Sequence, residues 1–177
     1  MRVIGGEYRS RRLKTLPGPA LRPTPDRLRE SLFSILAPGI GGCVFLDAYA
    51  GCGAVGIEAL SRGAARAVFI EKHRPAVRLI GENLRSLGAE SRAQVIHGPA
   101  LKHLGRMAAD IVFLDPPYGL EREYSEALRL LAGRPPGLVI AQHSSRLRLE
   151  EAYGALRRTR ALKQGDNVLS FYSESAP

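Results

Sequence analysis

The sequence predicts a doubly wound α/β fold, and three observations support this prediction. From residue 43 onward, short continuous apolar runs alternate with segments whose apolar residues recur at helical spacing. Strands with continuous apolar sequence are buried on both faces, as in a parallel sheet covered by helices, and this alternation is typical of α/β proteins. The chain then closes on two strand-like segments separated by too few residues for a crossover helix.

The first 38 residues predict a small basic extension. Residues 2–16 alternate loosely about a pair of glycines and suggest a β-hairpin. Residues 17–23 are rich in proline and glycine and are interpreted as a linker. Thr24 is expected to cap a helix in which Pro25 occupies the first position. The apolar face of this helix, which ends at Pro38-Gly39, consists of Leu28, Leu32, Ile35 and Leu36.

Residues 39–177 are expected to form one α/β domain. Its predicted parallel strands are the apolar runs at residues 43–46, 67–70, 94–96, 111–114 and 138–141. A helix before Gly88 is predicted by the spacing of Val77, Ile80, Leu84 and Leu87. Segments 156–163 and 167–173 flank Gly165-Asp166 and predict an antiparallel hairpin at the edge of the sheet.

The charge of the chain indicates an anionic partner. Its 177 residues carry 26 Lys and Arg against 17 Asp and Glu, a net charge of +9. Residues 1–36 hold eight basic and three acidic residues, so a net +5 lies in a fifth of the chain. A solvated basic face, or a genome that favours arginine, would give the same numbers. Arginine is nevertheless the side chain best suited to bidentate phosphate contact.

The composition also excludes several protein classes. Apolar residues make up 45% of the chain, which argues against a disordered protein. No apolar run approaches the roughly 18 residues that span a bilayer, and no secretory signal is visible. Two cysteines and four scattered histidines build neither a disulfide framework nor a CxxC metal site. We therefore expect a protein of the reducing cytoplasm with no metal and no membrane partner.

A glycine-rich turn follows the first predicted strand. The spacing Gly51-x-Gly53-x-x-Gly56 allows a tight strand-to-helix turn and a close approach of a ligand to the backbone. Glu71 ends the second strand, where a carboxylate can accept the hydroxyls of a ribose. Ligands of open α/β sheets bind outside the carboxyl ends of the strands. A nucleoside-bearing cofactor is therefore expected at this turn.

Asp47 separates two cofactor classes that share this glycine pattern. It lies four residues before Gly51 and would place a second carboxylate at the mouth of the site. A carboxylate repels the diphosphate of a nicotinamide dinucleotide but attracts an ammonium or a sulfonium. S-adenosylmethionine carries both cations and no phosphate, so it is the favoured cofactor. An aspartate that only caps the following loop or helix is the structural alternative.

Asp115-Pro116-Pro117-Tyr118 follows the fourth predicted strand. The prolines fix the backbone, so the carbonyl of Pro116 would project beside the Asp115 carboxylate. Two neighbouring acceptors suit the exocyclic amine of a nucleobase, whose lone pair they would localise for attack on a methyl group. Tyr118 would stack on the base, which must first be flipped out of a duplex or folded RNA. The alternative is a proline turn that merely ends the strand.

The chain resembles the bacterial RsmD-type family, the 16S rRNA (guanine(966)-N(2))-methyltransferases. The Asp115–Tyr118 motif resembles that of amino-methyltransferases in general, and three longer motifs narrow the resemblance. They are Arg2-Val3-Ile4-x-Gly6-x-Tyr8-Arg9, Arg22-Pro23-Thr24-x-Asp26-Arg27-x-Arg29-Glu30-x-Leu32-Phe33 and Leu46-Asp47-x-Tyr49-Ala50-Gly51-x-Gly53-Ala54-x-Gly56-x-Glu58-Ala59-Leu60-Ser61-Arg62-Gly63-Ala64. The resemblance covers nearly the whole chain. Cys52 and Tyr49 replace the Ser and Phe that are common in the family.

The resemblance implies a class I S-adenosylmethionine-dependent methyltransferase with a Rossmann-like, seven-stranded, mostly parallel sheet and an antiparallel final hairpin. It implies methyl transfer to the N2 amine of one guanine in 16S rRNA. The partner implied is the small ribosomal subunit or a late assembly intermediate, and we expect a monomer. Because Pro99 offers no side-chain acceptor, contact with the adenine must come from the backbone or another residue.

The site residues implied by the resemblance fall into three groups. The catalytic pocket would consist of Asp115, Pro116, Pro117 and Tyr118. The cofactor would be held by Asp47, Ala48, Gly51, Gly53, Glu71, Lys72, Gly98, Pro99 and Ala100. RNA would contact Arg2, Arg9, Arg11, Arg12, Arg22, Thr24, Arg27 and Arg29. His143 could reach the site from the fifth strand, although a surface position is favoured.

Other functions remain open on the sequence alone. An NAD-dependent oxidoreductase shares the glycine pattern, and a non-catalytic RNA-binding or assembly factor would need the basic extension without Asp115–Tyr118. A DNA amino-methyltransferase shares the Asp-Pro-Pro-Tyr chemistry. The chain leaves little room for a domain that reads DNA sequence, which counts against the last of these.

Overall fold

The structure, a computed structural model, describes residues 1–16 and 24–174. The predicted linker at residues 17–23 and the predicted RNA contact Arg22 lie outside the described residues. The helices are α1 (Asp26–Leu36), α2 (Ala54–Ser61), α3 (Arg74–Leu87) and α4 (Glu121–Ala132), with 3₁₀ turns η1 (Glu90–Arg92), η2 (Ala100–Lys102) and η3 (Leu104–Arg106). The strands are β1 (Val44–Asp47), β2 (Arg66–Glu71), β3 (Ala93–His97), β4 (Ile111–Leu114), β5 (Leu138–Ser144), β6 (Ala152–Tyr153), β7 (Leu156–Gln164) and β8 (Asn167–Glu174).

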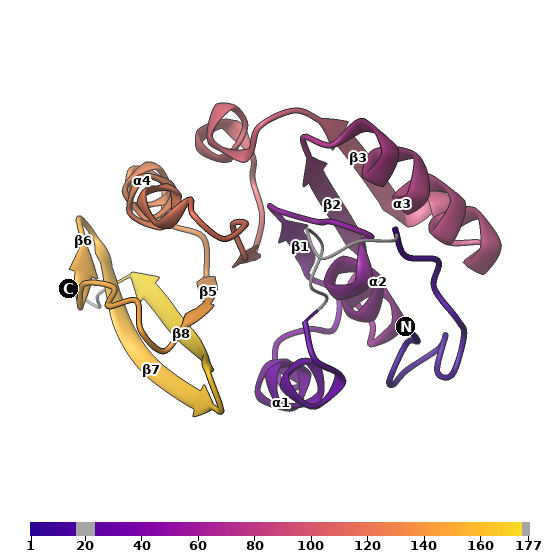
Figure 1. Cartoon of the computed structure of the whole chain (residues 1–177), viewed down its shortest axis with the longest axis horizontal. Helices are drawn as coiled ribbons and strands as arrows, with labels where there is room; N and C mark the ends of the chain where they lie inside the picture. Colours follow the sequence, from indigo (N-terminus) through magenta and orange to yellow (C-terminus); the bar gives the residue numbers. More distant parts are fainter. Residues whose placement is uncertain (17–23, 175–177) are drawn as a thin grey trace.

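The strands form a single mixed sheet in the order β3-β2-β1-β4-β5-β8-β7-β6 (Figure 1). The first five strands in this order are parallel, and β8 enters antiparallel beside β5. The predicted α/β fold and the closing hairpin are therefore confirmed. The sheet has eight strands rather than seven, because the two-residue β6 adds to the outer edge of β7. A strand of two residues carries too little pattern to be predicted from sequence.

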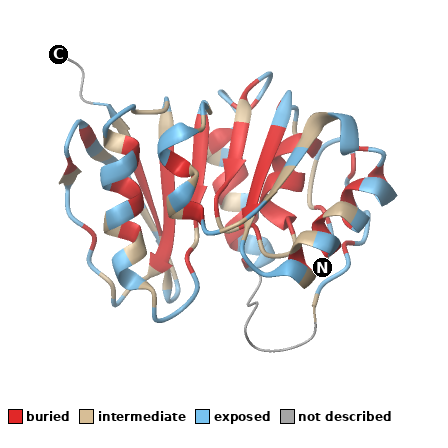
Figure 2. Cartoon of the chain, turned by 90° about the horizontal axis from the view of Figure 1, so that it is seen from above, coloured by how far each residue is buried: buried red, intermediate tan, exposed pale blue. Residues whose placement is uncertain are grey.

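Helices cover both faces of the sheet, as continuous apolar strands require. One face packs against α4, η2 and η3, and the other packs against α1, α2 and α3. Figure 2 shows the resulting layers, with buried strands between helices whose outer sides are exposed. The predicted stop of α3 is confirmed, since Gly88 adopts the left-handed conformation with a φ of 66°.

The N-terminus differs from the predicted hairpin. Residues 1–14, here called the arm, contain one isolated antiparallel bridge between Arg2 and Arg12 and no ladder of strands. The arm instead packs Val3, Tyr8 and Leu13 into the apolar core formed by α2 and α3. Side chains of these helices bind the arm's backbone, so a partner strand is not required.

The helix after the predicted linker begins one residue later than expected. Pro25, not Thr24, occupies the N-cap position of α1, and no side chain caps this end. The Thr24 hydroxyl is committed elsewhere, since it donates to Oε1 of Gln142 on β5 over 3.1 Å. This bond ties the start of α1 to the carboxyl end of β5.

Candidate functional site

The carboxyl ends of the parallel strands bring the predicted site residues to one edge of the sheet. Asp47 is the last residue of β1 and lies opposite Phe69 of β2 and Phe113 of β4 in the register. Glu71 is the last residue of β2, and Asp115 immediately follows β4. Three carboxylates from separate parts of the sequence therefore surround the point where β1 ends, as predicted for ligand sites in such sheets.

The glycine turn joins β1 to α2. Gly51 and Gly53 have φ values of 56° and 82°, a conformation that glycine adopts without strain. Gly56 serves the packing of α2 on β2, because a Cβ at this position would lie 2.3 Å from the Phe69 ring. The backbone N–H of Gly56 donates to Oδ2 of Asp47 over 3.0 Å. The aspartate thus holds the first turn of α2 close to the end of β1.

The surroundings of Asp47 and Asp115 raise the pKa of both carboxyl groups and so favour their neutral forms. Asp47 is only 2% exposed, and burial raises its pKa to about 7, although the bond from Gly56 lowers it and the Glu71 charge raises it. Burial and the nearby Asp47 charge raise the pKa of Asp115 to about 7 as well. A cation placed between these two groups would favour their charged forms, so the site is electrostatically suited to a positively charged ligand.

Glu71 is predicted to bind a ligand, and in the structure it also accepts two backbone hydrogen bonds. Its Oε2 accepts the backbone N–H of Gly51 over 2.9 Å, and its Oε1 accepts that of His73 over 2.7 Å. The carboxylate therefore fixes the glycine turn against the end of β2. Each carboxylate oxygen can accept more than one hydrogen bond, so acceptor capacity remains for a hydroxyl-bearing ligand.

The remaining predicted cofactor residues lie at the same edge. Gly98 follows β3, and its backbone N–H donates to the carbonyl of Glu71 over 3.0 Å. A Cβ on Gly98 would lie 2.7 Å from Nε2 of His103. Ala100 is buried, and Lys72 is exposed. Ala48 is also buried, and its N–H donates to the carbonyl of Phe113.

A cavity of about 340 Å³ opens beside Asp115. Its walls come from the Asp115–Tyr118 motif, the start of α4, the end of β5 and the β7–β8 turn. Pro116 is buried, whereas Tyr118 is 78% exposed at the rim. The motif therefore combines a carboxylate facing a cavity with an exposed aromatic ring beside it, the arrangement that a flipped base requires.

Several of the residues that line this cavity were not predicted from the sequence. His143 was expected at the surface, and this prediction is wrong because its side chain is 5% exposed and lines the cavity. Its Nε2 is hydrogen-bonded to Ser170 Oγ of β8 over 2.9 Å, and burial lowers its pKa. Tyr124 and Gln142 also line the cavity. The packing of α4 on β5 brings Tyr124 to Gln142, and the insertion of β8 supplies Ser170 to His143; the sequence shows neither contact.

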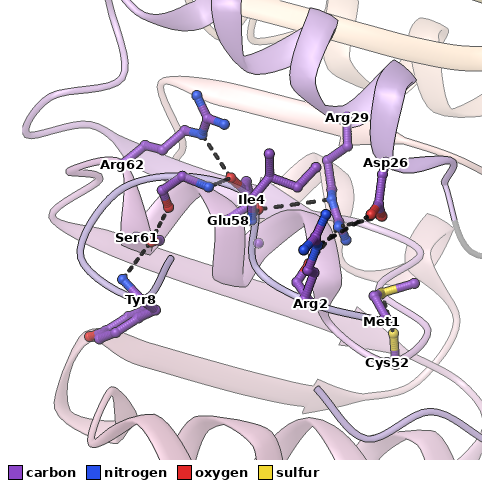
Figure 3. A network of polar contacts seen from close by, with 12 residues as sticks. Met1, Arg2, Ile4, Tyr8, Asp26, Arg29, Cys52, Glu58, Ser61 and Arg62 are labelled. Carbon is purple, nitrogen blue, oxygen red and sulfur yellow. Dashed lines mark hydrogen bonds and ion pairs between the residues drawn. The ribbon is translucent and has the colours of Figure 1, made fainter. Parts of the chain in front are cut away.

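The arm is fastened to α2 by a buried carboxylate, shown in Figure 3. Glu58 is fully buried, and its two oxygens accept the backbone N–H groups of Ile4 and Gly5, each over 2.9 Å. Its Oε1 also accepts from Nε of Arg62 over 2.8 Å. Ser61 adds a second anchor, since its hydroxyl accepts the N–H of Tyr8 over 2.8 Å. The Glu58–Arg62 part of the family motif therefore holds the arm.

Arg29 does not lie at the surface, so its assignment as an RNA contact is wrong. Its side chain is fully buried, and its Nη2 donates to the carbonyl of Arg2 over 2.6 Å and to Asp26 over 3.0 Å. Its Nε lies 3.9 Å from Glu58 (Figure 3). Its position was detectable, because Arg29, Leu32, Phe33 and Leu36 share one face of α1.

The other basic residues of the N-terminal region fit the prediction of a charged surface. Exposed residues of this region include Arg2, Arg9, Arg11, Arg12 and Arg27. Thr24 is buried against Gln142 beside the cavity. In residues 1–16 and 24–174, no group of three or more His, Cys, Asp or Glu residues is placed to hold a metal ion. No helix within the same ranges has the length and apolar character that crossing a membrane demands.

In this sheet, β8 pairs antiparallel with β5, the last of the parallel strands. The same arrangement is found in class I S-adenosylmethionine-dependent methyltransferases, and the chain has their fold. The family model described as Conserved hypothetical protein 95 matches residues 1–173. The chain belongs to this family, the RsmD-type methyltransferases.

Relatives and a solved structure agree with this assignment. Ribosomal RNA small subunit methyltransferase D of Escherichia coli (strain K12) is 45% identical over 120 residues, which cover 67% of this chain and 60% of that protein. YlbH of Bacillus subtilis (strain 168) is 33% identical over 186 residues, or 98% of this chain and 99% of that protein. The structure of yhhF from Escherichia coli superposes with a TM-score of 0.88 and 32% identity, covering 100% of this chain and 99% of that one.

Proposed function

We propose that the protein transfers a methyl group from S-adenosylmethionine to the N2 amine of a guanine in 16S rRNA of the small ribosomal subunit. The observation that carries this proposal is the position of Asp115. Its carboxylate faces a cavity of about 340 Å³ at the end of β4, directly beside the strand that ends in Asp47. The name of the Escherichia coli relative, a small-subunit rRNA methyltransferase, supports the choice of substrate.

The residues at the glycine turn fit this cofactor. Asp47 is buried, and its pKa is raised to about 7. A cationic ammonium or sulfonium beside it would favour its charged form, and the resulting carboxylate would attract that cation. Glu71 retains acceptor capacity for ribose hydroxyls. Gly51, Gly53 and Ala48 would border the cofactor's methionine end, and Lys72 with residues 98–100 would border its adenine. When bound, the cofactor supplies an electrophilic methyl group.

The Asp115–Tyr118 motif would activate the target amine. The amine nitrogen of guanine is a weak nucleophile because its lone pair is delocalised into the ring. Hydrogen bonds donated by its two N–H groups to Asp115 and to the carbonyl of Pro116 draw the nitrogen toward tetrahedral geometry and localise that lone pair. Asp115 then accepts the proton released from the nitrogen, a role for which a pKa of about 7 is suitable.

Tyr118 and the cavity walls would receive the base. An exposed aromatic ring at the rim can stack on a flipped base, a contact worth about 1–3 kcal/mol. A cavity of about 340 Å³ lies at the small end of the range for ligand pockets, about 300–1,000 Å³, as one base requires. The prolines of the motif fix the backbone so that Asp115 and the Pro116 carbonyl stay side by side.

We further propose that residues 1–38 form an RNA-facing extension and residues 39–177 form the methyltransferase domain. The exposed arginines of the arm and α1 would contact phosphates. Replacement of three of them by alanine should flatten the dependence of affinity on salt by about 0.7–0.9 in logarithmic slope for each phosphate that is no longer neutralised. An unchanged slope would show that the arm does not touch RNA. The three are Arg9, Arg11 and Arg12.

The substrate also defines the expected setting of the protein. The small ribosomal subunit is assembled in the cytoplasm, so we propose that this protein acts there, as a monomer and without a metal. The arm and α1 offer a limited surface for gripping a large RNA. Much of the specificity would then come from the shape of the particle on which the protein docks.

Transfer of tritiated methyl groups to small subunits that lack the modification tests the proposed activity, and mass mapping of the modified guanines identifies the target. Asp115→Ala should lower the rate by about 10²–10⁴, the usual contribution of a positioned acid or base. Asp110→Ala is the matched control, because Asp110 is a carboxylate at the opposite end of β4. Undiminished transfer by Asp115→Ala would overturn the mechanism.

Calorimetry with two ligands separates the proposal from an oxidoreductase. S-adenosylhomocysteine should bind and NADH should not, because the buried Asp47 would repel a diphosphate. The opposite result would favour the oxidoreductase. Binding of small subunits without any turnover would favour a non-catalytic assembly factor.

A further inference from the structure

One buried side chain connects the arm to the glycine turn. Asn83 lies on α3 and is 1% exposed. Its Oδ1 accepts the backbone N–H of Lys14 over 2.8 Å, and its Nδ2 donates to the carbonyl of Lys14 over 3.1 Å. The same Nδ2 donates to the carbonyl of Cys52 over 3.1 Å. Asn83 therefore binds both backbone groups of the arm's last residue and one carbonyl of the glycine turn.

The chemistry of this position admits only an amide side chain. One atom must accept an N–H, and the other must donate to two carbonyls at once. Aspartate would place acceptors against the carbonyls of Lys14 and Cys52, and leucine would leave three backbone groups without the partner that Asn83 provides.

The glycine turn also contacts the arm directly. Sγ of Cys52 lies 3.8 Å from Sδ of Met1 (Figure 3). Leu13 N–H donates to the carbonyl of Met1, so both ends of the arm are joined to each other. Cys52 stands between Gly51 and Gly53, the two glycines with positive φ that form the proposed cofactor turn. Any ligand that fixes Cys52 therefore acts on a residue that contacts the arm directly at Met1 and, through Asn83, at Lys14.

We propose that Asn83 is a positioning residue that links the cofactor turn to the RNA-contacting arm, so that each ligand strengthens the binding of the other. This inference rests on the proposed function, in which the turn holds the cofactor and the arm holds RNA. The cofactor orders Cys52, and through Asn83 it orders Lys14 and the arm, which lowers the entropy that RNA binding must overcome. Linkage between two binding equilibria is reciprocal, so RNA tightens cofactor binding by the same factor.

The affinity of unmethylated small ribosomal subunits, measured by filter binding with and without saturating S-adenosylhomocysteine, tests this linkage. We expect the wild-type protein to bind subunits at least about fivefold more tightly with the ligand, the lower end of typical coupling. In Asn83→Leu this ratio should fall to about one. A general loss of stability would not lower this ratio, because a ligand that binds only the folded protein raises the folded fraction of a destabilised variant.

Glu82→Gln is the matched control. Glu82 is the neighbour of Asn83 on α3 and contacts the same residue of the arm, but through an exposed ion pair with Lys14 Nζ at 2.8 Å. This variant should keep the wild-type ratio. Equal ratios in the wild type and Asn83→Leu would overturn the role of Asn83.

Hydrogen exchange of the wild-type protein gives a test that needs no variant. Added S-adenosylhomocysteine should slow amide exchange in residues 1–14, including the Lys14 amide that donates to Asn83. Unchanged exchange there would overturn the linkage even if Asn83→Leu fails to fold. Wild-type protein that binds neither the ligand nor the subunits would contradict the proposed function, whereas independent binding of the two would contradict the linkage alone.

Discussion

Replacement of Asp47 by asparagine should stabilise the protein without ligand at alkaline pH while it abolishes cofactor binding. The asparagine side chain would keep an oxygen for the Gly56 N–H and would remove a buried charge. Burial raises the pKa of Asp47 from 3.8 to about 7, so the folded state binds this proton more tightly than the unfolded chain does. The stabilisation from Asp47 is therefore complete below pH 3.8 and is lost as the pH rises through 7.

The size of this effect follows from the two pKa values. With values of about 7 folded and 3.8 unfolded, the wild-type protein loses about 2 kcal/mol of unfolding free energy through Asp47 between pH 5.5 and pH 8. The asparagine variant lacks this loss. Its stability relative to wild type should thus increase by about 2 kcal/mol over the same interval. Removal of the Asp47 charge also lowers the pKa of Asp115, which acts in the same direction.

Urea unfolding of both proteins at pH 5.5 and pH 8 measures the difference, with other titrating groups shared by the two chains. Saturating S-adenosylhomocysteine should reverse the order at pH 8, because its ammonium pairs with the ionised aspartate of the wild type only. A stability difference that stays constant with pH would refute the reasoning, since it would mean that Asp47 is ionised in the folded protein at pH 5.5.

Three further substitutions test other parts of the structure. Gly56→Ala should destabilise the protein by about 1–3 kcal/mol through its clash with Phe69, and thermal unfolding measures this; wild-type stability would show that α2 shifts without cost. Arg29→Ala should cost about 3–5 kcal/mol, because Glu58 loses a buried partner; a loss below about 1 kcal/mol in urea unfolding would count against the buried pair. Tyr118→Ala should leave stability unchanged, since the ring is 78% exposed, and should weaken substrate binding by about 1–3 kcal/mol; unchanged affinity would remove the stacking role.

The parallel half of the fold was predictable because its strands are buried on both faces. A short continuous apolar run such as residues 111–114, in a chain where such runs alternate with helical patterns, predicts a strand of a parallel sheet. The carboxyl ends of these strands then placed Asp47, Glu71 and Asp115 together without knowledge of any contact. The hairpin around Gly165 was equally local, since Gln164 and Asn167 pair directly across two residues.

The features that were missed depend on contacts between distant parts of the chain. The arm alternates like a strand, but its backbone is bound by Glu58 and Ser61, 53 or more residues away. Arg29 was predicted to contact RNA because it is charged. It is buried because it lies on the apolar face of α1. His143 was interpreted as a surface residue because the partner that buries it, Ser170, arrives only with β8.

The interior place of β8 makes the sheet depend on a strand that is synthesised after all the parallel strands. Ribosomes make proteins from the N-terminus, so β5 waits with an unpaired apolar edge until residues 167–174 are released and inserted. The β8 strand also carries Ser170, and the β7–β8 turn supplies one wall of the cavity at Asp115. A chain that lacked β8 would thus expose the unpaired backbone edge of β5 to chaperones and proteases. It would also lack one wall of the cavity at Asp115.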